Sequence, residues 1–171
     1  MKRMFALLLA ASLSSGAALA PALAAPRLGQ PAPELVMDQL DGRTFDLAHE
    51  RGKVVIVSLW ATWCAPCRAE MPILDGLYRT HQGQGLDVIG LSADRLKARD
   101  EVIRAAEPFS YPSGLVLSAR TNGFGHPRAL PQTFVIDRKG VVRAAFGVLG
   151  SPVTEAGLEK AIEPLLADPG G

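Results

Sequence analysis

The chain has 171 residues, of which 48% are hydrophobic and 20% charged, as is usual for one globular domain. Its formal net charge is +1, and it has no run of basic residues interleaved with aromatic side chains, so nucleic acid is excluded as a substrate. The sequence contains no internal repeat that would indicate a repeat architecture.

The N-terminal segment has the layout of a signal peptide. Two basic residues at the start are followed by an apolar run, and residues 22–24 (Ala-Leu-Ala) make an A-x-A cleavage site. Cleavage there divides the chain into a leader, residues 1–24, and a domain, residues 25–171. The charge-free stretch 4–25 is also long enough to span a bilayer, so an uncleaved membrane anchor is the alternative. Either way, we expect the folded domain in the periplasm or another extracytoplasmic compartment.

The next elements in chain order are strands and one helix. Residues 34–47 predict two short extended pieces around an Asp-Gly turn, a β-hairpin. Residues 53–60 form a continuous apolar, β-branched run, which is typical of a strand buried on both faces. A helix is expected over residues 64–80, with Pro72 inside it as a kink. Residues 85–94 predict a second buried strand.

The C-terminal half continues the alternation. Residues 95–107 predict a helix capped by Asp94 and stopped before Pro108. Residues 113–118 are a weaker strand candidate, and residues 119–130 are mostly loop. A β-hairpin over residues 132–147 follows. The last helix begins at residue 151, with Ser151 as its N-cap and Pro152 in its first turn. This order predicts an α/β fold, a central mixed β-sheet flanked by helices with an added N-terminal β-hairpin.

The chain contains only two cysteines, Cys64 and Cys67, and their spacing restricts what they can do. A structural zinc site needs four ligands, and neither a second cysteine pair nor histidines with ligand spacing are present. Haem attachment needs a histidine directly after the second cysteine, where this chain has Arg68. A disulfide across two residues closes too short a loop to stabilise a fold much, so a structural bridge is the weaker alternative to redox chemistry.

The position of the cysteine pair suits thiol–disulfide exchange. Cys64 lies where a buried strand ends and a helix begins, so unpaired N–H groups and the positive end of the helix dipole stabilise its thiolate. Such a thiolate attacks a disulfide, and Cys67, one turn into the helix, is close enough to resolve the mixed disulfide that forms. Pro66 suits the first helical turn and stiffens the loop.

The segment VVIVSLWATWCAPCRAEMP, residues 54–72, resembles the active-site segment of the thioredoxin superfamily. More narrowly, it resembles the exported TlpA/ResA-like thiol–disulfide oxidoreductases, with the DsbE/CcmG type nearby. The resemblance continues through GLDVIGLSAD and ALPQTFVIDRKG into the last helix and covers residues 30–167. It implies a thioredoxin-like fold and an enzyme whose redox-active disulfide is Cys64–Cys67.

The resemblance also implies roles for single residues. Cys64 corresponds to the exposed nucleophile and Cys67 to a more buried resolving cysteine. Pro131 corresponds to a cis-proline that faces the disulfide and presents the backbone of Leu130 to substrate. Glu70 corresponds to an acid that lies near the active site and influences thiol ionisation, the alternative being a solvated glutamate in the first helical turn.

Two departures from the resemblance bear on chemistry. Ser58 replaces the buried aspartate of cytoplasmic thioredoxin, so proton transfer at Cys67 must use water or another group such as Glu70. Leu130 replaces a glycine that is frequent in relatives, which would narrow the substrate groove. We further expect Trp63 to pack around the sulfurs. The remaining expectations are a core position for Trp60, surface positions for His49 and His81, and a solvated loop position for His126.

The resulting prediction is an extracytoplasmic thiol–disulfide oxidoreductase that reduces client disulfides, with cytochrome c or cytochrome oxidase assembly as candidate settings. The resemblance implies a membrane electron donor of the DsbD/CcdA type. We expect a monomer with no cofactor beyond the disulfide and no resident metal. Two alternatives stay open, a disulfide-forming oxidant and a copper-handling assembly factor that binds Cu(I) through the same dithiol.

Overall fold

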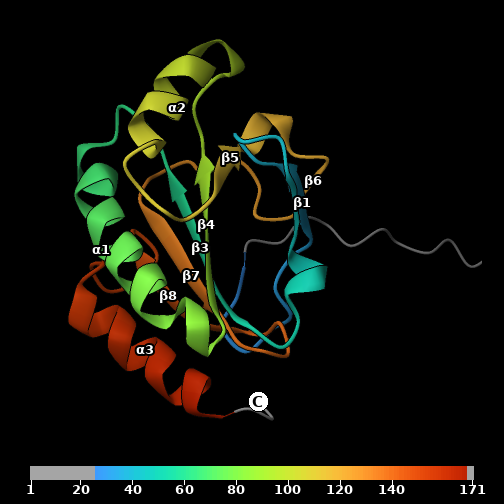
Figure 1. The fold of residues 1–171 in the computed structure, drawn as a ribbon, viewed down its shortest axis with the longest axis vertical. Coiled ribbons are helices and arrows are strands. Elements are labelled where there is room, and N and C mark those ends of the chain that lie inside the picture. Colours follow the sequence, from blue (N-terminus) through green and yellow to red (C-terminus); the bar gives the residue numbers. More distant parts are fainter. Residues whose placement is uncertain (1–25, 169–171) are drawn as a thin grey trace, which may run out of the picture.

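The computed structural model describes residues 26–168, coloured along the chain in Figure 1. The expected leader, its cleavage site and the alternative membrane anchor lie outside the described residues. Within residues 26–168, no helix is long and apolar enough to cross a membrane.

Five strands form a central mixed sheet in the order β5-β4-β3-β7-β8. Strands β4 and β5 run parallel to β3, whereas β7 runs antiparallel to β3 and to β8. All seven residues of β3 are buried, which explains its continuous apolar run, because a middle strand covered on both faces has no solvent side. The strands are β3 (Val54–Trp60), β4 (Leu86–Ser92), β5 (Ser113–Leu115), β7 (Gln132–Ile136) and β8 (Val142–Gly147).

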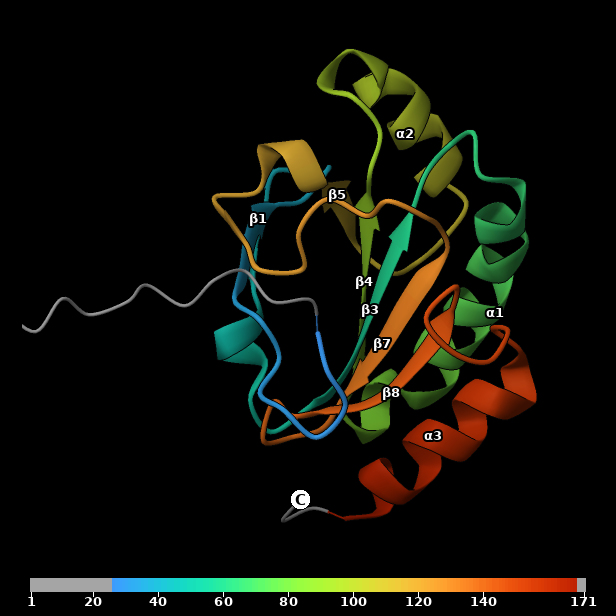
Figure 2. The same ribbon diagram turned by 180° about the vertical axis from the view of Figure 1, so that it is seen from behind.

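A smaller sheet in the order β2-β1-β6 lies against one face of the central sheet (Figures 1 and 2). Strands β1 (Leu35–Asp38) and β2 (Thr44–Asp46) pair antiparallel around a turn in which Gly42 has a positive φ of 87°. Strand β6 (Thr121–Asn122) falls in the segment expected to be mostly loop, and it pairs antiparallel with β1. A strand of two residues is too short to show a hydrophobic periodicity in the sequence. It forms because its backbone pairs with the free edge of β1.

Helices α1 (Ala65–His81) and α3 (Glu155–Ala167) lie side by side on the opposite face of the central sheet, as both views show. Helix α2 (Arg99–Ala106) lies beyond the carboxyl ends of β3 and β4. Short 3-10 turns complete the described fold, at Leu47–Glu50, Gln82–Gln84, Leu96–Ala98 and Val116–Ser118. The last of these turns occupies the second half of the weaker strand candidate, residues 113–118.

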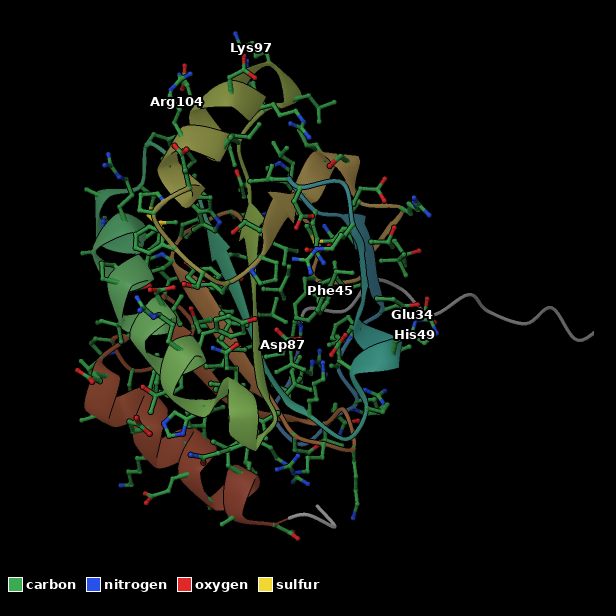
Figure 3. The ribbon with its side chains drawn as sticks, in the orientation of Figure 1. Glu34, Phe45, His49, Asp87, Lys97 and Arg104 are labelled. Atoms are coloured by element: carbon green, nitrogen blue, oxygen red, sulfur yellow. A yellow bond between two sulfur atoms is a disulfide. The ribbon has the colours of Figure 1, made fainter. Side chains whose placement is uncertain are left out.

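Alternate residues of β3 face the two sides of the sheet. Val55 and Val57 pack in one cluster with Phe45 of the smaller sheet, which Figure 3 shows pointing into the interior. Val54 and Ile56 pack in a second cluster with apolar residues of α1 and α3, namely Leu74, Leu77, Leu158 and Ile162. A third cluster forms at the end of the strand, around Trp60, which is buried as expected.

Two predicted helix caps are wrong. Asp94 does not cap α2, whose N-cap is Ala98 with no side-chain hydrogen bond, because a 3-10 turn comes between them. Ser151 does not cap α3, because the chain first returns along the end of β8, where the Ser151 carbonyl accepts a hydrogen bond from Gly147 N at 2.8 Å. The N-cap of α3 is Thr154, whose Oγ1 accepts from Gly157 N at 3.1 Å.

His81 is not a surface residue as expected. Its side chain is largely buried at the end of α1, and its Nε2 lies 3.0 Å from Glu159 Oε1 on α3. His81 therefore joins the two helices that cover one face of the sheet. His49 and His126 are exposed, as predicted.

Candidate active site

The cysteine pair lies at the junction between β3 and α1. Trp60 ends the strand, a three-residue loop of Ala61, Thr62 and Trp63 follows, and Cys64 is the N-cap of α1. Cys64 and Cys67 form a disulfide with an S–S distance of 1.99 Å. The Sγ of Cys64 also accepts a hydrogen bond from the backbone N–H of Cys67 at 3.3 Å. The first turn of the helix thus directs an N–H group at the sulfur that is predicted to become the attacking thiolate.

Both cysteines are largely buried in this disulfide form. Cys64 is 5% exposed and Cys67 is 2% exposed, so Cys67 is the more buried of the two, as expected. Cys64, however, is not the exposed residue that the resemblance implies. The two belong to a cluster with apolar residues from β3, the loop after it, α1, α2 and β5, namely Trp60, Ala61, Met71, Val102, Ala106 and Leu115. This apolar cluster thus shields both cysteines from solvent in the disulfide form.

Trp63 does not pack around the sulfurs as expected. It is 71% exposed, so most of the indole faces solvent directly beside Cys64. Two shallow grooves border this side of α1, with volumes of about 480 Å³ and 410 Å³, and both are lined by Arg68 and Arg104. Figure 3 shows Arg104 on α2, near the end of the molecule that carries the loop. The surface beside the redox loop thus carries an exposed aromatic ring, two cationic side chains and the carboxylate of Glu101, although neither cysteine lines these grooves.

The Leu130–Pro131 peptide bond is cis, in agreement with the expected cis-proline. Leu130 packs against the cluster that contains the two cysteines, and Gln132, the next residue after Pro131, pairs with Leu59 of β3. The Pro131 carbonyl accepts a hydrogen bond from Val148 N at 3.0 Å. The loop between β8 and α3 therefore supports the segment that contains the cis-proline.

Glu70 is half-buried, one helical turn after Cys67. Its Oε2 is buried without a hydrogen-bond partner among the described residues, and burial raises the pKa of this carboxyl to about 7. This environment does not fit the alternative of a fully solvated glutamate. Ser58 cannot replace the aspartate of thioredoxin as a charged group, and its Oγ accepts a hydrogen bond from Thr133 Oγ1 at 3.3 Å.

Asp94 is a site residue that sequence reasoning missed. It is 3% exposed, and its carboxylate accepts hydrogen bonds from the backbone N–H and the hydroxyl of Thr62, two residues before Cys64. A signal was present, because Asp94 closely follows β4, and the carboxyl ends of neighbouring parallel strands meet at one edge of a sheet. The prediction that Asp94 caps the following helix did not take account of its position beside the end of β3.

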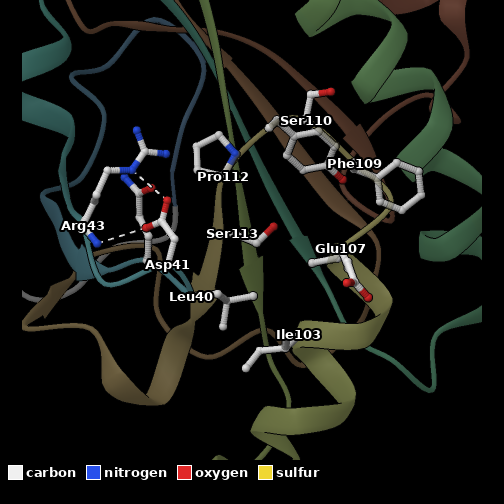
Figure 4. Close-up of a pocket in the computed structure, with 12 residues that line it drawn as sticks. Leu40, Asp41, Arg43, Ile103, Glu107, Phe109, Ser110, Pro112 and Ser113 are labelled. Atoms are coloured by element: carbon white, nitrogen blue, oxygen red, sulfur yellow. Dashed lines mark hydrogen bonds and ion pairs between the residues drawn. The ribbon is translucent and has the colours of Figure 1, made fainter.

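A separate pocket of about 330 Å³ lies between the β1–β2 turn and the segment from α2 to β5 (Figure 4). Its charged side chains are Glu107 and the exposed ion pair of Arg43 with Asp41, at 2.7 Å. Neither cysteine lines this pocket, so it is distinct from the disulfide site.

The fold and the site define a class: a central mixed sheet with a Cys-x-x-Cys disulfide at a helix N-terminus is the arrangement of a thioredoxin-like thiol–disulfide oxidoreductase. Residues 28–145 match the model of the AhpC/TSA family, and the chain belongs to this family. It is 35% identical over 119 residues to the thiol–disulfide oxidoreductase ResA of Geobacillus thermodenitrificans, a match that covers 68% of this chain and 67% of that protein.

Solved structures show the same fold. A putative thiol:disulfide interchange protein DsbE from Chlorobium tepidum superposes with a TM-score of 0.69 at 22% identity, over 83% of this chain and 99% of that one. A secreted thiol-disulfide isomerase from Corynebacterium glutamicum superposes with a TM-score of 0.63 at 25% identity, over 80% and 86% of the two chains. The chain is thus an enzyme of thiol–disulfide exchange, and its clients are proteins with thiols or disulfides.

Proposed function

We propose that this enzyme works outside the cytoplasm as a reductant of client disulfides, with Cys64 as nucleophile and Cys67 as resolving cysteine. The observation that carries the proposal is the Cys64–Cys67 disulfide at the start of α1, where Cys64 Sγ accepts the N–H of Cys67. The same hydrogen bond would stabilise the Cys64 thiolate after reduction.

The proposed reaction proceeds in two exchanges. The Cys64 thiolate attacks one client sulfur, so that a Cys64–client bond forms, the client S–S bond breaks and the leaving thiolate takes up a proton. Cys67 then loses its proton and attacks Cys64 Sγ, which forms the Cys64–Cys67 bond and releases the second client sulfur for protonation. Two electrons and two protons pass to the client. A dithiol donor must therefore reduce the enzyme again, and the resemblance implies a membrane donor of the DsbD/CcdA type.

Glu70 supports the reducing direction and the proton transfer. A carboxyl with a pKa of about 7, one turn from Cys67, is suited to accept the proton of that thiol. When it is ionised, its negative charge disfavours a nearby thiolate, and a less stabilised dithiol gives up its electrons more readily.

The extracytoplasmic location is supported by the signal-peptide pattern of residues 1–24 and by the likeness to a secreted isomerase. In an oxidising compartment, a reductant is needed wherever the cysteines of a client must stay reduced, as in the assembly of cytochrome c or of a copper centre. N-terminal sequencing of the exported protein tests the location: Ala25 at the start supports cleavage, and an intact leader supports the anchor.

The reduction potential of the Cys64–Cys67 pair tests the direction. We would equilibrate residues 25–171 in thiol redox buffers and quantify free thiols by alkylation. A value near or below about −270 mV, that of thioredoxin, supports a reductant, whereas a value near about −120 mV defines a disulfide donor and overturns the proposal.

Covalent trapping tests the residue roles. A Cys67→Ser variant keeps the nucleophile but cannot resolve the mixed disulfide, so it should accumulate disulfide-linked clients, while a Cys64→Ser variant should not. Failure of Cys67→Ser to trap any client, together with tight Cu(I) binding by the dithiol and little turnover, would favour a copper-handling factor instead.

A further inference from the structure

The loop that carries the nucleophile is held by a buried carboxylate. Asp94 Oδ2 accepts hydrogen bonds from Thr62 N and Ser92 Oγ, both at 2.8 Å, and Oδ1 accepts from Thr62 Oγ1 at 2.7 Å. The backbone N–H of Asp94 in turn donates to Ser92 Oγ at 3.1 Å. We refer to Asp94, Thr62 and Ser92 as the loop clamp.

A carboxylate in this position is costly unless it is fully hydrogen-bonded. Asp94 is 3% exposed, and within residues 26–168 no basic side chain forms an ion pair with it. Its charge is instead stabilised by three donors, two of which belong to one residue of the redox loop. Losing Thr62 would therefore leave a buried charge with a single side-chain partner.

The clamp has a different importance in the two redox states. In the disulfide form, the S–S bond itself holds Cys64 against Cys67 at the start of α1. In the dithiol form this covalent tie is absent, and the position of Cys64 depends on the backbone of the loop. Thr62 lies two residues before Cys64. Trp63, between them, is 71% exposed, so few contacts of its side chain fix the backbone of the loop.

We propose that Asp94 is a positioning residue for the exchange reaction, acting through Thr62 to keep Cys64 Sγ at the helix N-terminus when the disulfide is open. This inference rests on the proposed function. Because the clamp stabilises the reduced thiolate more than the disulfide, weakening it shifts the redox equilibrium towards the disulfide and slows attack by Cys64.

The test combines Thr62→Val, which removes one donor at nearly constant shape, with Asp94→Asn and the double variant. We would measure the equilibrium with the glutathione redox couple and, in a Cys67→Ser background, the rate of Cys64 alkylation by iodoacetamide across pH. Each single variant should slow alkylation at pH 7 by about three- to tenfold and shift the equilibrium by a similar factor. The double variant should be little worse than either single one, because both break the same contact.

Matched controls separate positioning from stability. Thr62→Ser keeps the hydroxyl and should restore the wild-type alkylation profile. Asp137→Asn alters another buried carboxylate, 4% exposed, which holds the turn between β7 and β8 through Lys139 N and Val141 N. It should lower the melting temperature without changing Cys64 reactivity or the redox equilibrium.

Two results would overturn the inference. If Asp94→Asn accelerates alkylation while Thr62→Val has no effect, Asp94 acts only through its charge and not through the loop. If Thr62→Val, which is expected to fold, matches the wild type in both measurements, the clamp does not position Cys64. Failure of the wild-type enzyme to exchange with glutathione at all would instead contradict the proposed function.

Discussion

At the scale of single residues, the chemistry of this site is set by a few side chains held in unusual surroundings. Glu70 shows this most directly, because its carboxyl is half-buried with one oxygen unpartnered among the described residues, and burial raises its pKa to about 7. In the unfolded chain the pKa of the same carboxyl is near its ordinary value of 4.5. Between these two values the folded protein binds more protons than the unfolded chain, so the contribution of Glu70 to stability falls as pH rises through this range.

A Glu70→Gln variant should remove this pH dependence. At pH 4 the carboxyl is mostly protonated in both states, so variant and wild type should unfold at similar denaturant concentrations. At pH 8 the variant should be more stable by about 1 kcal/mol, a value reduced for partial solvent screening. Denaturant unfolding of the oxidised proteins at both pH values measures this. Glu101→Gln, on the exposed side of α2, is the control, and an equal gain there would show a general charge effect.

At the scale of elements, the end of β8 packs closely against the backbone of the cis-proline, Pro131. Gly147, the last residue of β8, has a positive φ of 81°, and a Cβ built on it would lie 2.2 Å from the Pro131 carbonyl oxygen. A side chain cannot be added there unless the backbone of one segment moves. The neighbouring N–H of Val148 donates to the same carbonyl, so a shift would also weaken that bond.

Gly147→Ala should therefore lower both stability and exchange activity. The left-handed backbone and the close carbonyl together should cost about 2 kcal/mol or more in the free energy of unfolding. Client reduction should also slow at temperatures where the variant is folded, because Pro131 is displaced. Gly76→Ala is the matched control, since Gly76 lies on an exposed part of α1 with open space around it and alanine should stabilise the helix there. Wild-type activity in folded Gly147→Ala would contradict this argument.

At the scale of the whole molecule, Arg138 joins segments that are distant in sequence. Its guanidinium donates to backbone carbonyls before β3, before β4 and at the end of α3, at Gly52, Gln84, Leu165, Leu166 and Asp168. Gly52 precedes the first residue of β3, whereas the redox loop follows the last one. The arginine therefore ties the fold together at the end opposite the disulfide.

Arg138→Met should destabilise the protein without altering its redox chemistry. Several carbonyls would lose a charged donor, and we expect a loss of about 2–3 kcal/mol in denaturant unfolding. Arg138→Lys should recover only part of this, because an ammonium cannot reproduce the planar fork of donors. The redox equilibrium with glutathione should equal that of the wild type. A shifted equilibrium would mean that the two ends of the sheet are coupled.

Local patterns in the sequence were sufficient for much of the fold. The apolar run of β3, the alternation of strands and helices, and the Cys-x-x-Cys spacing depend on neighbours within one or two turns, and the structure agrees with them. The cis peptide bond at Pro131 was expected only through the family resemblance, because an isolated proline at a strand start favours the trans form.

The sequence by itself determined the redox pair and most of the order of elements, because these follow from hydrophobic periodicity and short-range spacing, and it indicated the class of protein through the resemblance of residues 54–72 to a known family. Only the tertiary structure decided what Asp94 binds, which residue caps α3, where β6 pairs and how exposed Trp63 is. The partner of Asp94 and the partner of β6 both come from segments that are distant in the sequence, namely Thr62 and β1. Such contacts arise from packing of the sheet against its neighbours, and no local pattern records which distant residue will be there.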